Sequence, residues 1–168
     1  MHTTGPIRVG TTASPITAID PDGTLRQKGV ALTPTAEELN QLAGVQGVKV
    51  AKVALGAADT GGGVLAWQNP EAGSIIVQRV LIDVTTAATG ACTIDVGTTA
   101  VSATTLSDNL IDGADIGTAA GVFDNITDKG SNGKSKQKLA AGKWVTGSKA
   151  SGAAAGTVGF AFIEYVVA

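Results

Sequence analysis

The strongest constraint on this fold is a pattern of short apolar runs, separated by Gly, Asn and Asp, that begins at Val48 and continues to the C-terminus. Runs of this kind are typical of the strands of a β-sandwich or barrel. Aromatic residues make up only 4% of the chain, so Val, Ile, Leu and Ala must form the core, and the β-branched ones favour strands. We therefore expect an all-β fold, a jelly-roll-like β-sandwich. The expected strands are residues 48–55, 64–67, 74–85, 91–96, 121–126, 137–146 and 157–167.

The longest run alternates with a period of two, as a strand with one partly wet face does. Its apolar face is expected to hold Ile76, Val80, Ile82 and Val84. Arg79 and Asp83 mark the opposite face.

The last run, 157–167, is apolar on both sides. This pattern predicts a strand that is central in its sheet or lies at a subunit interface. Phe160, Phe162 and Tyr165 are the candidate residues for such an interface between copies.

Residues 1–47 differ from residues 48–168, because four of the five prolines fall here and apolar residues come singly. Such a stretch is predicted to be an extended N-terminal arm, either an anchor on another protein's surface or a flexible leader. The candidate anchoring residues are Ile7, Val9, Ile16, Ile19 and Leu25. One short helix is expected at 35–43, where Thr35 and Glu38 form a capping box and Gly44 stands at the C-cap.

The sequence lacks the residues that the common catalytic sites need. The single histidine, His2, lies in the arm, and Cys92 is the single cysteine, so neither a Ser-His-Asp triad nor a His or Cys metal site can be assembled on the body. We expect no enzyme activity and no cofactor. Asp108, Asp112 and Asp115, with Asn109, offer oxygen ligands for calcium, although such residues more often form loop turns.

Residues 128–135 end like a phosphate-binding loop, but Asp128 stands where the motif needs its first glycine. The alternative for this segment is a hairpin turn at Asn132-Gly133. The sequon at Asn125 is read as a coincidence, because no secretory signal precedes it. Synthesis in the cytoplasm is therefore expected.

The net charge argues against two classes of partner, and the distribution of charge along the chain suggests one way in which copies could assemble. A net charge of −2 favours neither nucleic acid nor a membrane surface. Between Asp95 and Asp128 all charged residues are acidic, whereas between Lys129 and Lys149 all are lysines. These blocks are either two neighbouring solvated loops or complementary surfaces through which copies of the chain meet.

Residues 32–45, LTPTAEELNQLAGV, resemble a phrase that recurs in structural proteins of tailed bacteriophages, among them head fibres and decoration proteins. Pro34 departs from the Ala more common there. The body, with IDVG at 94–97 and DNLIDG at 108–113, looks like the β-rich modules attached to such segments. The resemblance implies a capsid decoration (cement) protein on the virion surface, commonly a homotrimer bound to the major capsid protein. The alternative is a tail-fibre or head-fibre module that binds a host receptor or glycan; an enzyme is the weakest reading.

Overall fold

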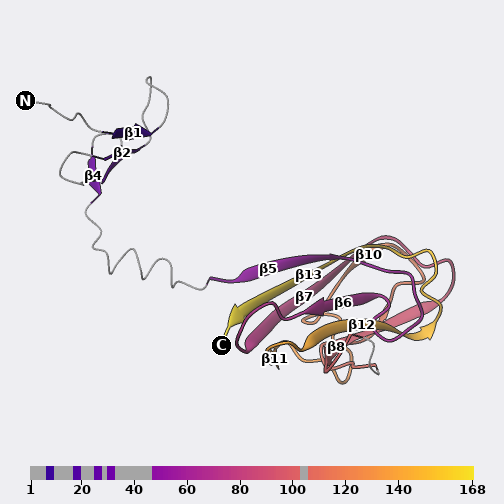
Figure 1. Ribbon diagram of the computed structural model, residues 1–168. Helices are drawn as coiled ribbons and strands as arrows, with labels where there is room; N and C mark the ends of the chain where they lie inside the picture. The colour runs from indigo at the N-terminus through magenta and orange to yellow at the C-terminus, as the bar shows by residue number, and fades with distance from the viewer. Residues whose placement is uncertain (1–6, 10–16, 20–24, 28–29, 33–46, 103–105) are drawn as a thin grey trace, which may run out of the picture. The chain divides into compact units, whose positions relative to one another are not determined.

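The computed structural model describes residues 7–9, 17–19, 25–27, 30–32, 47–102 and 106–168, and for the first four of these ranges the backbone alone. The chain divides into two compact units, residues 1–45 and 46–168 (Figure 1). Among the described residues, no helix is long and apolar enough to cross a membrane.

Four short strands lie in the N-terminal unit: β1 (Ile7–Val9), β2 (Thr17–Ile19), β3 (Leu25–Gln27) and β4 (Val30–Leu32). They pair antiparallel in chain order, with Ile7 opposite Ile19. A small sheet was not expected in a segment predicted to be an extended arm. Ile16 and the predicted helix at 35–43 lie outside the described residues.

The described residues of the body form nine strands in two antiparallel sheets. One sheet has the order β10-β7-β13-β5, with β11 also paired to β7, and the other has the order β6-β12-β8-β9. The strands are β5 (Lys49–Ala54), β6 (Leu65–Gln68), β7 (Ile75–Thr86), β8 (Cys92–Thr99), β9 (Ile111–Asp115), β10 (Gly121–Asp124), β11 (Gln137–Leu139), β12 (Trp144–Gly152) and β13 (Val158–Val167).

This strand order is that of a jelly roll. Because β10 and β11 both pair with β7, they occupy one place in the order of eight. The first, eighth, third and sixth strands then form one sheet, and the second, seventh, fourth and fifth form the other. The predicted all-β, jelly-roll-like sandwich is confirmed.

Two strand predictions need correction. Residues 111–115 form β9, although their sequence, IDGAD, has the composition of a loop. The predicted strand 137–146 is two strands, β11 and β12, separated by a turn in which Lys143 N–H donates to the Ala140 carbonyl (3.2 Å). Gly142 has a φ of 69° in that turn, a left-handed conformation that favours glycine.

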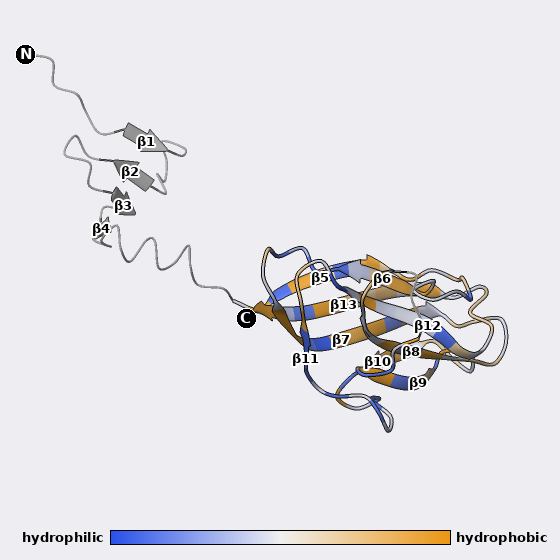
Figure 2. Cartoon of the chain, turned by 60° about the horizontal axis from the view of Figure 1, so that its bottom comes forward, coloured by the Kyte–Doolittle hydropathy of each residue, from blue (hydrophilic) through white to orange (hydrophobic). Residues whose placement is uncertain are grey.

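The core consists mainly of aliphatic side chains, as the low aromatic content predicted. Hydrophobic and hydrophilic residues both occur along the strands of the body (Figure 2). From β7 the core receives Val80, Ile82 and Val84, as expected, but Ile76 lies on the other face. A β-bulge between Arg79 and Val77, opposite Glu164 and Tyr165, shifts the alternation by one residue. Ile75 and Val77 therefore take the core positions of that half of the strand.

β13 is central in its sheet, between β7 and β5. This placement confirms the prediction drawn from its two apolar faces. Its inner face, with Ala161 and Ile163, is fully buried, whereas Phe160 and Phe162 are half-buried on the outer face.

Candidate functional site

The outer face of β13 carries two half-buried phenylalanines beneath one lysine. Phe160 and Phe162 lie opposite Ala54 and Lys52 of β5 in the strand register. The Lys52 ammonium lies 3.8 Å from the centre of the Phe160 ring and 5.6 Å from that of Phe162, within range of a cation–π interaction. Exposed Val50, on β5 beside Glu164, extends this apolar surface.

Tyr165, the third candidate interface residue, points to the inner side of the sheet. Its ring centre lies 5.2 Å from that of Trp67, and its hydroxyl donates to Glu71 Oε1 (3.1 Å). Lys49 Nζ donates to the same oxygen (2.8 Å). The hydrogen bond from Lys49 lowers the pKa of Glu71, while burial and the bond to Glu71 raise the pKa of Tyr165. The structure thus places Phe160 and Phe162 together and Tyr165 apart from them.

Asp124 and Asn125 tie the end of β10 to β7 and to the following loop. Arg79 donates to Asp124 Oδ2 through Nε (3.1 Å) and through Nη2. Burial alone would raise the pKa of Asp124, but hydrogen bonds from the Thr127 amide, Arg79 and the Ile126 amide lower it to about 2. Asn125 is fully buried; it accepts from the Val80 N–H (2.7 Å) and donates to the Lys134 carbonyl (3.1 Å). The sequon at Asn125 is therefore inaccessible in the folded body.

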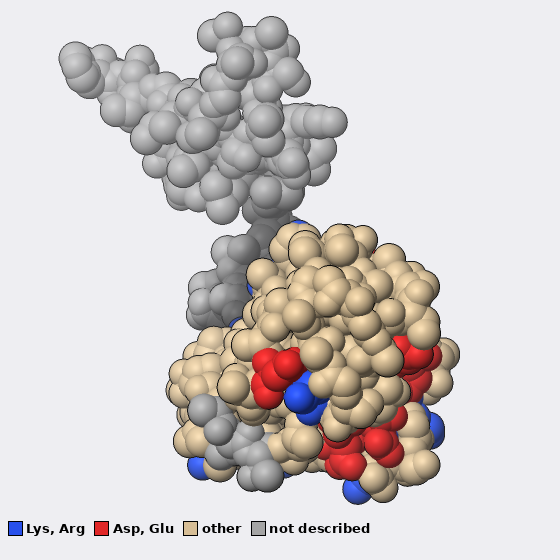
Figure 3. Space-filling model, turned by 90° about the vertical axis from the view of Figure 1, so that its right-hand side faces the viewer, with Lys and Arg blue, Asp and Glu red and all other residues tan. Residues whose placement is uncertain are grey.

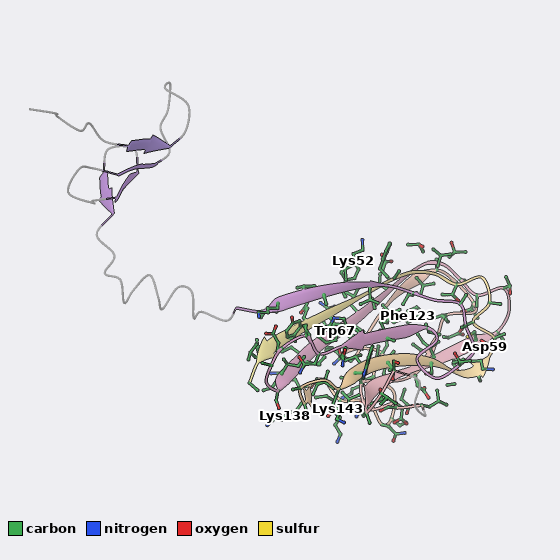
Figure 4. The ribbon with its side chains drawn as sticks, viewed as in Figure 1. Lys52, Asp59, Trp67, Phe123, Lys138 and Lys143 are labelled. Atoms are coloured by element: carbon green, nitrogen blue, oxygen red, sulfur yellow. The ribbon has the colours of Figure 1, made fainter. Side chains whose placement is uncertain are left out.

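A hollow of about 310 Å³ opens where β8 ends and β11 and β12 are joined. We call it the lysine hollow, because Lys138 and Lys143 are both among the residues that line it; both are labelled in Figure 4. It is lined by Thr98, Thr99, Ala100, Lys138, Leu139, Ala140 and Lys143. Leu139 is buried and both lysines are exposed, so the hollow combines an apolar floor with a cationic rim.

The wall of the lysine hollow is held in place by a buried asparagine, Asn69. Its Nδ2 donates to the carbonyls of Gly73 (3.0 Å), Ala140 (3.1 Å) and Leu139 (3.4 Å). Its own amide N–H donates to the Lys143 carbonyl (2.8 Å). The turn that carries Lys143 is therefore attached to the end of β6. The sequence shows the two lysines within a lysine-rich block, but it contains no signal that brings Thr98 and Thr99 to them.

The acidic residues considered as calcium ligands are used by loop turns. Asp112 Oδ2 accepts from the amides of Ser131 (3.2 Å) and Asn132 (3.1 Å), and Asp108 Oδ2 accepts from Asn132 Nδ2 (2.8 Å). Asp115 Oδ1 accepts from the Gly117 amide (2.9 Å). Among residues 47–102 and 106–168, no three His, Cys, Asp or Glu side chains are close enough to hold a metal ion. One end of the body shows more acidic than basic side chains on a mostly uncharged surface (Figure 3).

The predicted hairpin turn at Asn132-Gly133 is wrong. No strand lies between Asp124 and Gln137, and the Gly133 amide donates to the Lys129 carbonyl (3.1 Å). The positive φ in this loop belongs to Gly130 (64°), which packs against the backbone of Asp112. Cys92 is buried, and burial raises the pKa of its thiol, so it packs as a small apolar residue. His2 lies outside the described residues.

Comparison with known proteins gives one structural likeness. A chain of a solved structure described as the capsid of Ralstonia phage GP4 matches with a TM-score of 0.50 and 20% sequence identity. The match covers 82% of this chain and 91% of that chain. Residues 46–168 are 123 of the 168 residues, or about 73%, so the matched span also enters the N-terminal unit. At this identity the match shows a shared fold.

No protein-family model matches the sequence, and no curated protein matches it either.

Proposed function

We propose that this protein is a structural protein of a bacteriophage virion that decorates and stabilises the capsid, as a cement protein without catalytic activity. The observation that carries the proposal is the likeness in fold to a chain of a phage capsid structure, over 82% of this chain. The phage-like phrase at residues 32–45 supports the same reading. On this proposal the protein is made in the host cytoplasm and resides on the capsid surface.

Attachment is assigned to the N-terminal arm, residues 1–47, with the major capsid protein as partner. The anchors are Ile7, Val9, Ile16, Ile19 and Leu25. Each aliphatic anchor buried on a capsid surface contributes about 1.5 to 3 kcal/mol before ordering costs, so several have to act together. The body has its own buried core, so it needs no capsid contact to fold.

The test is to delete residues 1–30 and to mix the product with undecorated particles. The truncated protein is expected to retain its far-ultraviolet circular dichroism, because the core lies in the body, and to lose binding. If it decorates as well as the full chain, attachment lies in the loops of the body and the anchoring role of the arm is wrong. An electron-microscopy map of native particles separates a cement protein, present in hundreds of copies, from a fibre module, present in tens.

We further propose that the protein assembles as a homotrimer in which a neighbouring copy covers the outer face of β13. Phe160 and Phe162 are half-buried there and Val50 and Val158 are more than half exposed (59% and 53%). Covering such apolar surface favours association. Replacing Phe162 with Ser is expected to weaken the oligomer in sedimentation, while Tyr165→Phe, on the inner side, leaves the oligomer unchanged.

A further inference from the structure

Two oppositely charged clusters lie on the body, and neither forms an ion pair with the residues that the structure describes. The first is the lysine hollow, with Lys138 and Lys143 on its rim. The second, which we call the acidic cluster, consists of Asp95, Asp108 and Asp112. Asp95 Oδ1 accepts from the amide of Gly113 (2.9 Å), the residue after Asp112, and Asn132 donates to both Asp112 Oδ2 and Asp108 Oδ2, so the three carboxylates lie close together. Burial and the nearby charges of Asp112 and Asp108 raise the pKa of Asp95.

The two clusters meet at Asn109, which follows Asp108. Its Oδ1 accepts from the Thr98 amide (2.9 Å), and its Nδ2 donates to Thr98 Oγ1 (2.8 Å). Thr98 in turn lines the lysine hollow. Despite this proximity, none of the ion pairs among the described residues involves Lys138, Lys143 or the acidic cluster.

Hydrogen bonds from a neighbouring loop use part of the acidic cluster. One oxygen of Asp108 and one of Asp112 accept bonds from the loop at Ser131 and Asn132. The other oxygen of each carboxylate has no hydrogen bond from the described residues. In the lysine hollow, the ammonium groups of Lys138 and Lys143 have no ion-pair partner among the described residues. Thr98 Oγ1 accepts from Asn109 Nδ2, so its own proton is a further donor at the hollow.

We propose that the lysine hollow binds the acidic cluster of a second copy of this chain. Charge complementarity identifies the occupant. The hollow is suited to a short carboxylate, and the body itself carries Asp108 and Asp112, each with one oxygen that accepts no hydrogen bond from the described residues. Complementary charged surfaces set the register and orientation of copies in an assembly. This inference rests on the proposed assembly of the chain with itself, and it does not require the capsid.

The experiment exchanges the charges on the two sides. In the first variant, Lys138→Glu with Lys143→Glu, the hollow becomes acidic; in the second, Asp108→Lys with Asp112→Lys, the acidic cluster becomes basic. Each variant alone is expected to self-associate roughly tenfold or more weakly than the native chain, because like charges then face each other. An equimolar mixture is expected to regain association, because each variant then offers the surface that the other needs. Sedimentation velocity without particles measures all four samples.

Control variants test whether the effect is specific to the lysine hollow and whether the variants still fold. Lys134→Glu with Lys136→Glu makes the same charge change in the same block outside the hollow and is expected to associate like the native chain. Asp108→Asn with Asp112→Asn removes the negative charges but keeps the oxygen acceptors for the loop, so it replaces Asp108→Lys with Asp112→Lys if that variant does not fold. The asparagine variant is expected to associate more weakly than the native chain and to have the same thermal unfolding temperature. High ionic strength is expected to weaken the native assembly.

Several results would overturn this proposal. The first two are a native chain that sediments as a monomer and a Lys138→Glu, Lys143→Glu variant that associates like the native chain. The other two are an equimolar mixture of the two charge-exchanged variants that stays dissociated, and a Lys134→Glu, Lys136→Glu control that weakens association as much as Lys138→Glu with Lys143→Glu does. A hollow variant that self-associates normally but no longer binds particles would assign the hollow to the capsid instead. Binding of the native chain to undecorated particles is measured separately, so the decoration role stands or falls independently of these results.

Discussion

The junction at Asp124 and Asn125 and the lysine hollow are both polar regions of the body, but they differ in where their partners lie. At the junction the side chains are buried, and each is bonded to several groups of the same chain. In the hollow the lysines are exposed and have no ion-pair partner among the described residues. Buried polar groups that are fully bonded hold a fold together, whereas exposed unpaired charges contribute little stability and are free for a partner. The predictions below test that difference.

The largest expected effect is at Asn125. Replacing Asn125 with Ala removes the acceptor of the Val80 N–H, which is fully buried, and the donor to the Lys134 carbonyl. Leaving such a buried donor without a partner is expected to lower the free energy of unfolding by about 2 to 4 kcal/mol. Urea denaturation measures this change. Asn132→Ala, at an exposed site with one side-chain bond to Asp108, is the matched control and should cost less than about 1 kcal/mol; equal losses would contradict the comparison.

Asp124 is expected to make the stability of the body depend on acid pH. Its pKa falls from an ordinary value of 3.8 to about 2 in the folded protein, so its stabilisation is complete above about pH 4 and is lost as the pH falls toward 2. The shift corresponds to about 2 kcal/mol at neutral pH. Asp124→Asn should therefore unfold at lower urea concentration at pH 7 and approach the native chain near pH 2.

The control for this prediction is Asp83→Asn, on the outer face of β7. Asp83 has no ion pair among the described residues, so its removal should leave the pH dependence of unfolding close to that of the native chain. If Asp124→Asn retains the full loss of stability between pH 4 and pH 2, another carboxylate is responsible and the role of the Arg79 bond is wrong.

The sequence predicted the sandwich because the alternation in β7 and β13 follows directly from strand geometry. It misplaced Ile76, since a bulge opposite Tyr165 leaves no mark on the pattern of apolar residues. It missed β9, whose side chains are half polar because it is an edge strand. The period of two could have separated Tyr165 from Phe160 and Phe162, because odd and even positions of one strand face opposite sides.

The polar regions were harder to predict, because their members are far apart in the chain. Asn125 resembles any loop asparagine until β10 is seen to end beside Val80. The lysine hollow joins residues 98–100 to residues 138–143 through strand pairing between β8 and β12. The charge blocks in the sequence indicated acids and lysines, but they could not show that Asp108 is bonded to Asn132, 24 residues further along the chain.

Thr157 provides a smaller test with the opposite sign. It is buried (3% exposed), and its hydroxyl has no hydrogen-bond partner in the described part of the chain. Thr157→Val keeps the shape and removes an unbonded polar group, so it is expected to raise the free energy of unfolding by up to about 1 kcal/mol. Thr146→Val is the control: Thr146 is equally buried, but its hydroxyl is bonded to that of Thr99 (3.2 Å). This variant should lose stability, and a gain at both sites would show that the hydrogen bond is irrelevant.

The smallest expected effect on stability is at the lysine hollow itself. Lys138→Glu with Lys143→Glu changes the charge of the body by four units, but neither lysine is buried and neither forms an ion pair in the described residues. Each exposed charge of this kind contributes less than about 0.5 kcal/mol to the free energy of unfolding. The double variant should therefore unfold at the same urea concentration as the native chain. The measurement is made at low protein concentration, where both proteins are monomeric. A loss as large as that of Asn125→Ala would mean that the lysines support the fold. They would then belong with the buried junction, and the availability of the hollow for a second copy would lose its physical basis.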